Sequence, residues 1–185
     1  MNNQLIFLRH AKTQKDPSKV TTWLLTEEGE KAAQNLAESG VFDDIDIIIT
    51  STEQKAILTA TPFAKKLQKE IIKIPELNEI HRGKGEFLSQ EEFSKIKEQM
   101  FLDLDFTKDS WETSNNALKR FQMAISDIDN KYDNKKILIV SHGTVLSLYF
   151  ADLLNELNKV MQRWLRLGFC DWGVIENNKV MKDIV

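Results

Sequence analysis

Two of the three histidines in this 185-residue chain lie two residues after the end of a short apolar run. Residues 5–8 run into Arg9-His10, and residues 137–140 run into Ser141-His142-Gly143. Imidazole is a competent nucleophile near neutral pH, because its unperturbed pKa is about 6.5. The arginine beside His10 suits a phosphoryl target, whose oxygens a guanidinium binds in bidentate fashion. Either histidine alone would be interpreted as a hydrogen-bonded core residue, but the pair with its arginine and glycine neighbours indicates a site.

The elements that must position these histidines follow from the periodicity of apolar residues. Strands that alternate with helices predict a mostly parallel sheet covered on both faces, an α/β fold with three α/β/α layers. Reactive groups gather beyond the carboxyl ends of such strands, so both imidazoles are expected to open into one crevice. The predicted strands are 4–8, 45–50, 71–74 and 137–141, and the predicted helices are 26–39, 53–68, 89–101, 114–132 and a leucine-rich one after Gly143.

Local signals set several of these boundaries. Thr26 is placed to cap the first helix, and Ser89 with Glu92 has the spacing of a capping box. Pro62 falls inside the second helix and is expected to kink or split it. Asn177-Asn178 is a hairpin-type turn signal, which predicts a terminal strand pair at about 172–176 and 179–184.

Five segments, in the right order along most of the chain, resemble the histidine phosphatase superfamily, also called the phosphoglycerate mutase-like family. The segments are Leu8-Arg9-His10-Ala11-Lys12-Thr13, Leu25-Thr26-Glu27-Glu28-Gly29, the stretch 51–60, Leu77-Asn78-Glu79-Ile80 with Gly83, and Val140-Ser141-His142-Gly143. Ala11 stands where the family most often has glycine, a variant also seen in its phosphohistidine phosphatase branch. The resemblance implies the phosphoglycerate mutase-like fold. The length of the chain and the absence of a linker predict a single domain over residues 1–185, in which about 80–113 are expected to form a small cap.

The resemblance also implies a role for each site residue. His10 would attack phosphorus in line and become a phosphohistidine, which splits one hard displacement into two easier ones. Arg9 and His142 would bind the equatorial oxygens, with Lys55 as a further phosphate-binding cation. Glu79 would protonate the leaving alkoxide and then deprotonate the attacking water. No metal or other cofactor is expected, because the cationic side chains neutralise the phosphoryl charge and the sequence has no His-Glu-x-x-His motif.

Two of these assignments have alternatives. Lys55 stands where the family normally has a second arginine, so it keeps the charge but loses the planar two-donor fork. In the alternative interpretation, Lys55 is a solvated helix residue and the site has one cation fewer. Glu76 and Glu86 compete with Glu79 for the acid–base role, and His81 is expected at the surface or the rim.

The composition excludes several classes of protein. The chain has 25 basic and 28 acidic residues, a formal net charge of −3, which argues against broad nucleic-acid binding. A single cysteine, Cys170, excludes an internal disulfide and a multi-cysteine metal site. The N-terminal apolar run is too short for a signal peptide or a membrane span, so a cytoplasmic protein with no membrane partner is expected.

The function expected from these features is metal-independent phosphatase activity. The partner would be a phosphorylated small molecule or a phosphohistidine protein. Ala11 favours the protein substrate, whereas Glu79 favours an ester with a poor leaving group. One alternative is phosphoglycerate mutase-type phosphoryl transfer, for which the short cap leaves little room. The other is a phosphate-binding regulatory module with weak turnover, which the departures at Ala11 and Lys55 suggest.

Overall fold

A computed structural model describes residues 2–14, 22–83 and 88–185. The strands form one six-stranded sheet in the order β3-β2-β4-β1-β5-β6. The strands are β1 (Gln4–Arg9), β2 (Ile47–Thr50), β3 (Ile71–Lys73), β4 (Lys136–Ser141), β5 (Trp172–Glu176) and β6 (Lys179–Lys182). The first four are parallel to one another, and β5 and β6 are antiparallel additions at one edge.

The register of β1 and β4 decides where the two histidines lie. These strands are neighbours in the middle of the sheet, with Arg9 paired to Ser141. Both strands therefore end at the same level of the same edge. His10 and His142, the next residue of each strand, follow side by side.

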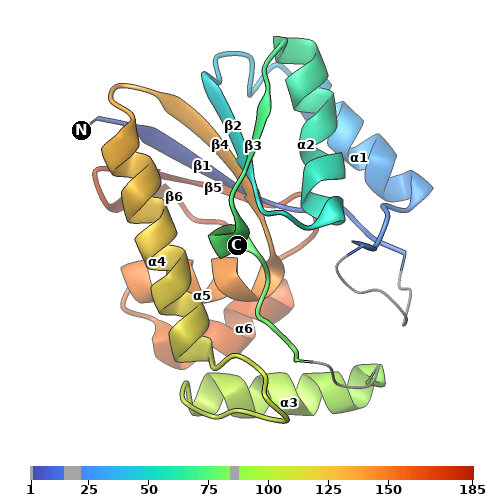
Figure 1. Ribbon diagram of the computed structural model, residues 1–185, viewed down its shortest axis with the longest axis vertical. Helices are drawn as coiled ribbons and strands as arrows, with labels where there is room; N and C mark the ends of the chain where they lie inside the picture. Colours follow the sequence, from blue (N-terminus) through green and yellow to red (C-terminus); the bar gives the residue numbers. More distant parts are fainter. Residues whose placement is uncertain (1, 15–21, 84–87) are drawn as a thin grey trace.

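Helices cover both faces of the sheet, as the alternation of strands and helices predicts (Figure 1). The α-helices are α1 (Glu27–Glu38), α2 (Gln54–Leu67), α3 (Gln90–Leu102), α4 (Ser114–Lys131), α5 (Gly143–Leu153) and α6 (Val160–Arg166), and the 3₁₀ turns are η2 (Pro75–Leu77) and η3 (Leu157–Lys159). On one face, α1 and α2 pack on alternate sheet residues, among them Ile6, Leu8 and Val140. On the other face, α4 and α5 pack on the intervening residues, among them Phe7 and Ile139.

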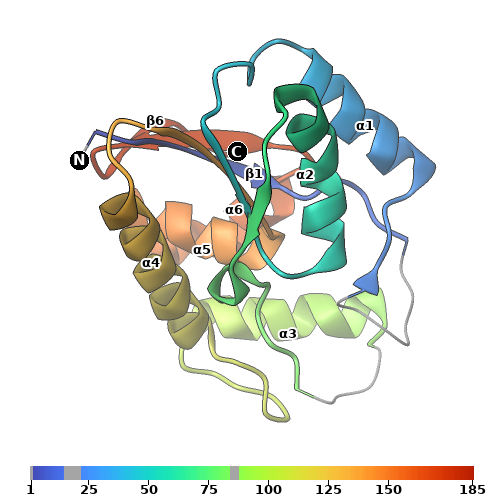
Figure 2. The same cartoon turned by 45° about the horizontal axis from the view of Figure 1, so that its top comes forward.

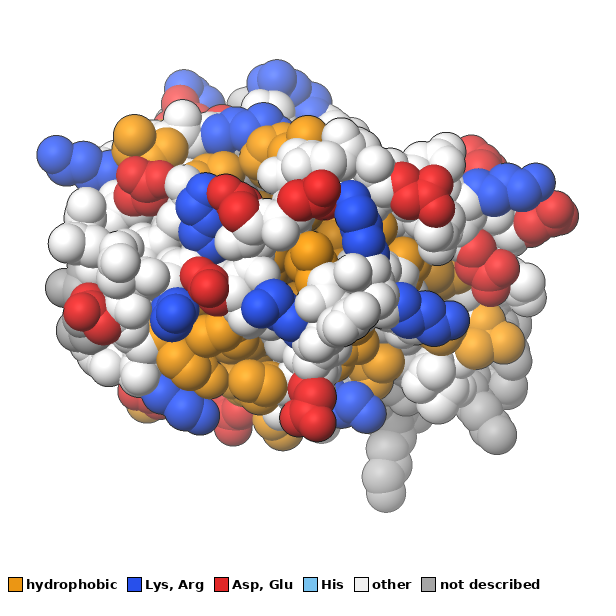
Figure 3. All heavy atoms as spheres, turned by 90° about the horizontal axis from the view of Figure 1, so that it is seen from above, with side chains coloured by type: hydrophobic (Ala, Val, Ile, Leu, Met, Phe, Trp, Pro, Cys, Tyr) orange, Lys and Arg blue, Asp and Glu red, His pale blue; other side chains and the backbone are white. Residues whose placement is uncertain are grey.

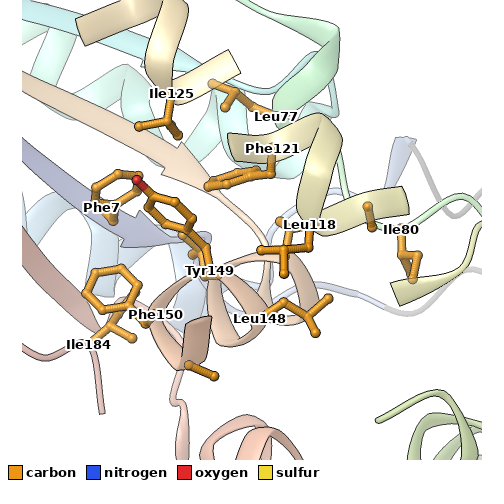
Figure 4. Close-up of a cluster of buried hydrophobic side chains, with 14 of the residues drawn as sticks. Phe7, Leu77, Ile80, Leu118, Phe121, Ile125, Leu148, Tyr149, Phe150 and Ile184 are labelled. Atoms are coloured by element: carbon orange, nitrogen blue, oxygen red, sulfur yellow. The ribbon is translucent and has the colours of Figure 1, made fainter. Parts of the chain in front are cut away.

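An aromatic cluster fills the layer between the sheet and the pair α4 and α5 (Figure 4). The ring of Phe7 lies 5.4 Å from Tyr149 and 5.5 Å from Phe150, measured between centroids. Phe121 of α4 completes the group at 5.3 Å from Tyr149. Buried aromatic pairs at such distances contribute about 0.5–1.5 kcal/mol beyond their burial. This cluster fixes β1, and with it the residues that follow β1, against α5.

The described residues between η2 and α4 extend beyond the sheet. Its helix α3 lies across one end of the molecule, away from the strands (Figures 1 and 2). The predicted capping box begins this helix: Ser89 accepts from the backbone N–H of Glu92, whose side chain accepts from the backbone N–H of Ser89. The buried side chain of Lys97 ties α3 to the beginning of α5 through the hydroxyl of Thr144.

Other predicted boundaries are also found. Thr26 caps α1 by accepting from the backbone N–H of Gly29 at 3.0 Å. Asn177 and Asn178 both have positive φ, at 49° and 58°, and connect β5 to β6 in an antiparallel pair. Such backbone angles are those of the two-residue hairpin turn that favours asparagine.

Two helices differ from what the sequence predicted. Pro62 does not split its helix, because α2 continues as one element from Gln54 to Leu67. Proline removes a single intrahelical hydrogen bond, whereas the buried stripe of Ala56, Ala60 and Phe63 binds both halves of α2 to the sheet. The short helix α6 was not predicted at all. Its seven residues are too few to show a clear helical period.

The surface at the top of the molecule carries charges of both signs. Figure 3 shows Lys and Arg side chains interspersed with Asp and Glu across this face. None of the described helices combines the length and the apolarity needed to cross a membrane.

Candidate active site

His10 and His142 face each other at the carboxyl ends of β1 and β4. Their ring centroids are 5.2 Å apart, with 7% of His10 and none of His142 exposed. The backbone N–H of His10 donates to the carbonyl of Ser141 at 3.0 Å, which continues the strand pairing by one residue. The two imidazoles therefore lie together at the edge of the sheet where their strands were expected to bring them.

The environment of His10 fixes its tautomer. Its Nδ1 lies 2.8 Å from the carbonyl oxygen of Ala11. Because a carbonyl only accepts, Nδ1 carries the proton of the neutral ring, and Nε2 presents a free lone pair. The pKa of His10 lies well below its usual value, chiefly because burial disfavours the charged ring and also because Lys55 and Arg9 add positive charge. At neutral pH the ring of His10 is uncharged, and its Nε2 is free to act as the nucleophile.

His142 is arranged to donate rather than to attack. The Ser51 hydroxyl accepts from the backbone N–H of Glu53 and lies 2.7 Å from Nε2 of His142. With that hydroxyl donating to Nε2, the proton of the neutral ring sits on Nδ1. Burial and the charge of Lys55 hold the pKa of His142 well below its usual value. Its buried Nδ1 has no hydrogen-bond partner among the described residues, so it is available to a ligand.

Arg9 supplies a fixed guanidinium beside the two rings. One Nη donates to the carbonyl of Leu167, and the guanidinium carbon lies 4.4 Å from the ring centroid of Phe169. The other side of the group packs against Gly143, where an added Cβ would come within 3.2 Å of Nε. Nε itself is buried and makes no hydrogen bond within the described part of the chain. Among the described residues, Nε of Arg9 and Nδ1 of His142 are thus two buried hydrogen-bond donors without an acceptor.

Glu79 lies in the same site. Its Oε2 accepts from the backbone N–H of Thr144 at 2.9 Å, and its Oε1 accepts from the N–H of Ile80 at 2.9 Å. Burial acts to raise the pKa of Glu79. The charge of Lys97, the nearby His142 and the two backbone donors outweigh burial and hold this pKa well below its usual range. Glu79 is therefore a carboxylate in the ligand-free protein.

The segment that carries Glu79 is anchored by the residues just before α2 and by α4. The side-chain oxygen of Asn78 accepts from the backbone N–H of Thr52 at 2.8 Å, and Arg120 of α4 donates to the carbonyl of Asn78 at 3.1 Å. Among the competing acids, Glu76 is exposed, and its backbone carbonyl accepts a hydrogen bond from Arg120. Glu86 lies outside the described residues. Of the two candidates that the structure describes, Glu79 is the one built into the site.

Lys55 is part of the site and is not a solvated helix residue. Only 4% of it is exposed, and its Nζ lies 2.7 Å from Oε2 of Glu53. The same ammonium is 5.3 Å from the ring centroid of Trp23. Its charge acts on both His10 and His142. The lysine thus brings a cation to the site, but a cation that is already paired.

Three charged site residues were missed in the sequence: Glu53, Arg82 and Lys97. Glu53 is a buried acid within the segment that carries Lys55, with 6% exposed. Arg82 stacks on Phe93 at 4.4 Å and acts electrostatically on Glu79 and Glu53. Lys97 of α3 is fully buried and donates to the Thr144 hydroxyl at 3.0 Å. In a sequence, such residues look like ordinary charged surface positions, and only the fold turns them inward.

The loop after β1 is held by its backbone. The N–H of Ala11 donates to the Thr59 hydroxyl at 2.9 Å, and the methyl group of Ala11 is buried beside Leu25. Ala11 is not among the residues with positive φ, so this position has no need of the family's usual glycine. Gly29 is different, because a Cβ there would lie 2.2 Å from the carbonyl oxygen of Lys12. The glycine lets α1 approach the loop.

Other side chains weighed in the sequence lie apart from this chemistry. His81 is exposed, as expected. Cys170 is partly buried, and burial raises the pKa of its thiol to about 11, so it is a poor nucleophile. Within the described ranges, no group of three or more His, Cys, Asp or Glu side chains is placed to hold a metal ion.

Comparison with known proteins identifies relatives of the chain. The sequence matches the histidine phosphatase superfamily (branch 1) over residues 5–181. The uncharacterized phosphatase PhoE of Bacillus subtilis (strain 168) is 27% identical over 125 residues, which cover 68% of this chain. The match spans 62% of that relative's own length.

Solved structures share the fold along nearly the whole chain. Bacillus stearothermophilus YhfR superposes with a TM-score of 0.79 and 21% identity over 97% of this chain and 95% of that one. Phosphoserine phosphatase from Entamoeba histolytica, in complex with 3-phosphoglyceric acid, superposes with a TM-score of 0.78 and 23% identity over 96% of each chain. A mycobacterial glucosyl-3-phosphoglycerate phosphatase superposes with a TM-score of 0.76 and 18% identity over 94% of this chain and 90% of that one. With this fold and the match over residues 5–181, the chain belongs to the histidine phosphatase superfamily, branch 1.

Proposed function

We propose that this protein is a metal-independent phosphatase that hydrolyses a phosphomonoester through a phosphohistidine on His10. The observation that carries the proposal is the bond from Nδ1 of His10 to the carbonyl of Ala11. It leaves Nε2 as an unprotonated nucleophile in a buried site. The buried, unpartnered donors of Arg9 and His142 support the same reaction, because a phosphoryl group brings the oxygens that they lack.

In the first step, Nε2 of His10 attacks phosphorus in line with the leaving oxygen. The N–P bond forms as the P–O bond to the alcohol breaks. Arg9 and Nδ1–H of His142 donate to the equatorial oxygens, where charge accumulates. Preorganised donors of this kind contribute about 10²–10³ each to the rate. The paired Lys55 supplies a further positive charge to the same region.

In the second step, water attacks the phosphohistidine and releases phosphate. Glu79 takes a proton from this water, for which its carboxylate form is ready.

In the first step the leaving alkoxide needs a proton, and Glu79 passes one to it. The incoming phosphoryl anion raises the proton affinity of the neighbouring Glu79, because like charges oppose ionisation. General acid–base catalysis of this kind contributes about 10²–10⁴ to the rate.

A small phosphomonoester is favoured over a phosphohistidine protein as the substrate. Phosphoserine and glucosyl-3-phosphoglycerate phosphatases, which share the fold, are named for small phosphate esters. Glu79 also suits an ester, whose alkoxide is a poor leaving group and needs the proton. Ala11, which favoured the protein substrate, is accounted for by its ordinary backbone and its buried methyl group. A cytoplasmic location is part of this proposal and is compatible with the single, unpaired cysteine.

Hydrolysis of p-nitrophenyl phosphate by the wild-type protein and by His10→Ala tests the proposal. We expect turnover by the wild type and none above background by the variant. Equal rates in the two proteins would reject the enzyme and leave the phosphate-binding module. A screen of phosphorylated metabolites and one phosphohistidine protein then identifies the substrate. Isomerisation of 3-phosphoglycerate after priming with the 2,3-bisphosphate would instead indicate a mutase.

A further inference from the structure

Glu53 places a carboxylate among the groups that would bind the phosphoryl group. Its Oε2 is 2.7 Å from Nζ of Lys55, and its Oε1 is 3.4 Å from Nε2 of His142. The same Oε1 accepts from the backbone N–H of Glu79 at 2.7 Å. An ammonium and a backbone N–H thus hold the Glu53 carboxylate as they would hold an anion, and the neutral ring of His142 lies beside it.

Glu53 does not have the usual role of an acid at the beginning of a helix. It is the N-cap residue of α2, yet its side chain makes no capping hydrogen bond. The carboxylate turns instead toward the site, with 6% of the residue exposed. Burying a carboxylate is costly unless it is paired, and Lys55 supplies the pairing. The Glu53 carboxylate therefore lies in the site and does not contribute to the capping of α2.

The charges around Glu53 come from each element packed against it. Lys55 faces it from α2, and His142 from the end of β4, with a neutral ring. The segment after η2 contributes Glu79, which is ionised, and Arg82, whose positive charge acts on Glu53 and Glu79. The cations nearest to Glu53 are therefore already balanced by two carboxylates.

A doubly charged phosphoryl group would meet this carboxylate directly. A phosphoryl oxygen bound by Lys55 shares the ammonium with Oε2 of Glu53, so the two oxygens lie a few ångströms apart. Both side chains are almost fully buried, so water and salt screen their repulsion only weakly. A phosphoryl group that keeps one proton avoids this repulsion, because its P–OH can donate to the carboxylate.

We propose that the site binds the singly charged, protonated form of the phosphoryl group and that Glu53 selects this form by accepting a hydrogen bond from its P–OH. The inference rests on the proposed function for the identity of the ligand. It makes Glu53 a specificity-determining residue. The proton also balances the first step. The monoanionic ester and neutral His10 give the neutral alcohol and a phosphohistidine of the same total charge, and the P–OH proton ends on the leaving oxygen. Glu79, which is ionised before the substrate binds, then passes on a proton that entered with the substrate.

Two matched ligands test the proposal without turnover. Benzylphosphonate and its α,α-difluoro analogue have the same shape and resist hydrolysis, but the fluorine atoms lower the pH at which the second proton is lost. Their binding is measured by calorimetry between about pH 5 and pH 8, a range that contains the second ionisation of most phosphoryl groups. The pKa values of His10 and His142 lie well below the usual one, chiefly because both rings are buried, and both histidines are present in every protein compared. We expect the affinity of the wild type to fall about tenfold per pH unit above the second ionisation of each ligand, and to fall first for the difluoro compound.

Glu53→Gln then assigns this selectivity to the carboxylate. The amide keeps the shape of the side chain and no longer repels a dianion, so we expect its affinity for both ligands to change less than about threefold over the same range. Glu76→Gln removes an exposed acid nearby and is the matched control, for which the wild-type profile is expected. Lys97, whose pKa is about 7, is common to all three proteins, so its titration cancels in the comparison.

The outcomes separate this inference from the proposed function. If the affinity of the wild type follows one pH profile for both ligands, or if Glu53→Gln keeps the wild-type profile, the inference is wrong. Failure of both ligands to bind near pH 5 also overturns it. If Glu53→Gln does not fold, the comparison of the two ligands on the wild type still decides. A protein that binds as expected but hydrolyses no phosphomonoester would contradict the proposed function and leave the inference standing.

Discussion

Nδ1 of His10 lies 2.8 Å from the carbonyl oxygen of Ala11, the next residue in the chain. This bond holds the imidazole in the tautomer that has its lone pair on Nε2. Ala11 is in turn fixed, because its N–H donates to Thr59 and its side chain is buried. A nucleophile is thus oriented by the residue beside it, and the site needs no separate acid to orient it.

Glu79→Gln tests the acid–base role through the leaving group. The amide cannot exchange a proton, so we expect kcat for an alkyl phosphate to fall by about 10²–10⁴. The loss should be smaller for p-nitrophenyl phosphate when formation of the phosphohistidine limits the rate, because nitrophenolate leaves without a proton. Steady-state rates on both substrates, with a burst measurement to find the limiting step, give the comparison. Equal losses with phosphohistidine formation limiting would contradict a role in protonating the leaving oxygen.

Lys55→Arg and Lys55→Met test whether this lysine takes the place of the family's second arginine. The arginine keeps the charge and adds a two-donor fork, so we expect its activity to equal or exceed that of the wild type. The methionine removes a cation and leaves Glu53 unpaired and buried, so we expect kcat/KM to fall by about 10²–10³. A large loss in Lys55→Arg would show that Lys55 does not stand in the arginine's place.

Lys97 makes the stability of the fold depend on pH. Burial lowers the pKa of Lys97 to about 7, although Glu79 and Glu112 act to raise it. Above that pH the folded protein has lost a proton that the unfolded chain keeps until about pH 10. The free energy of unfolding therefore rises with pH in this window, by up to about 1.4 kcal/mol per pH unit. Below about pH 7, Lys97 causes no such rise.

Urea unfolding of the wild type and Lys97→Met between about pH 7 and pH 9 measures this contribution. We expect the methionine variant to lose the rise. Lys95→Met, on an exposed position of the same helix, should keep it. Parallel curves for the wild type and Lys97→Met would contradict a depressed pKa at this lysine.

Gly29→Ala tests the contact between α1 and the loop that follows His10. Its Cβ would lie 2.2 Å from the backbone oxygen of Lys12, so either the loop or the helix must shift. We expect a loss of about 1–3 kcal/mol in the free energy of unfolding, together with a lower kcat/KM. Gln34→Ala, at an exposed position of α1, is the control. Unchanged unfolding of Gly29→Ala would show that the close approach is absent.

Much of the fold could be predicted from the sequence, because its main signals are local. The apolar alternation of β1 and β4 and the capping residues Thr26 and Ser89 each act within a few residues. They placed the elements within a few residues of where the structure has them. Because His10 and His142 follow two such strands, the parallel-sheet prediction also brought them to the same edge of the sheet, where the structure has them.

The remainder depends on contacts between distant segments. Glu53 is the N-cap residue of α2, Arg82 lies in the segment that follows η2, and Lys97 lies in α3. Each of the three is charged like a surface residue. No local pattern shows that Lys97 enters the core against Thr144, 47 residues away. The continuity of α2 through Pro62 has the same origin, since packing against the sheet outweighs the local preference. The electrostatic character of the site could therefore be found only in the fold.

Rapid-quench trapping of the phosphoenzyme tests the central claim most directly. The wild-type protein, mixed with a labelled phosphomonoester and quenched in alkali, should yield a phosphorylated chain that loses its label in acid, as phosphohistidine does. Mass spectrometry should place the phosphoryl group on His10, and His10→Ala should give no labelled chain. A wild-type enzyme that turns over the ester without an acid-labile phosphoryl group on His10 would contradict the account.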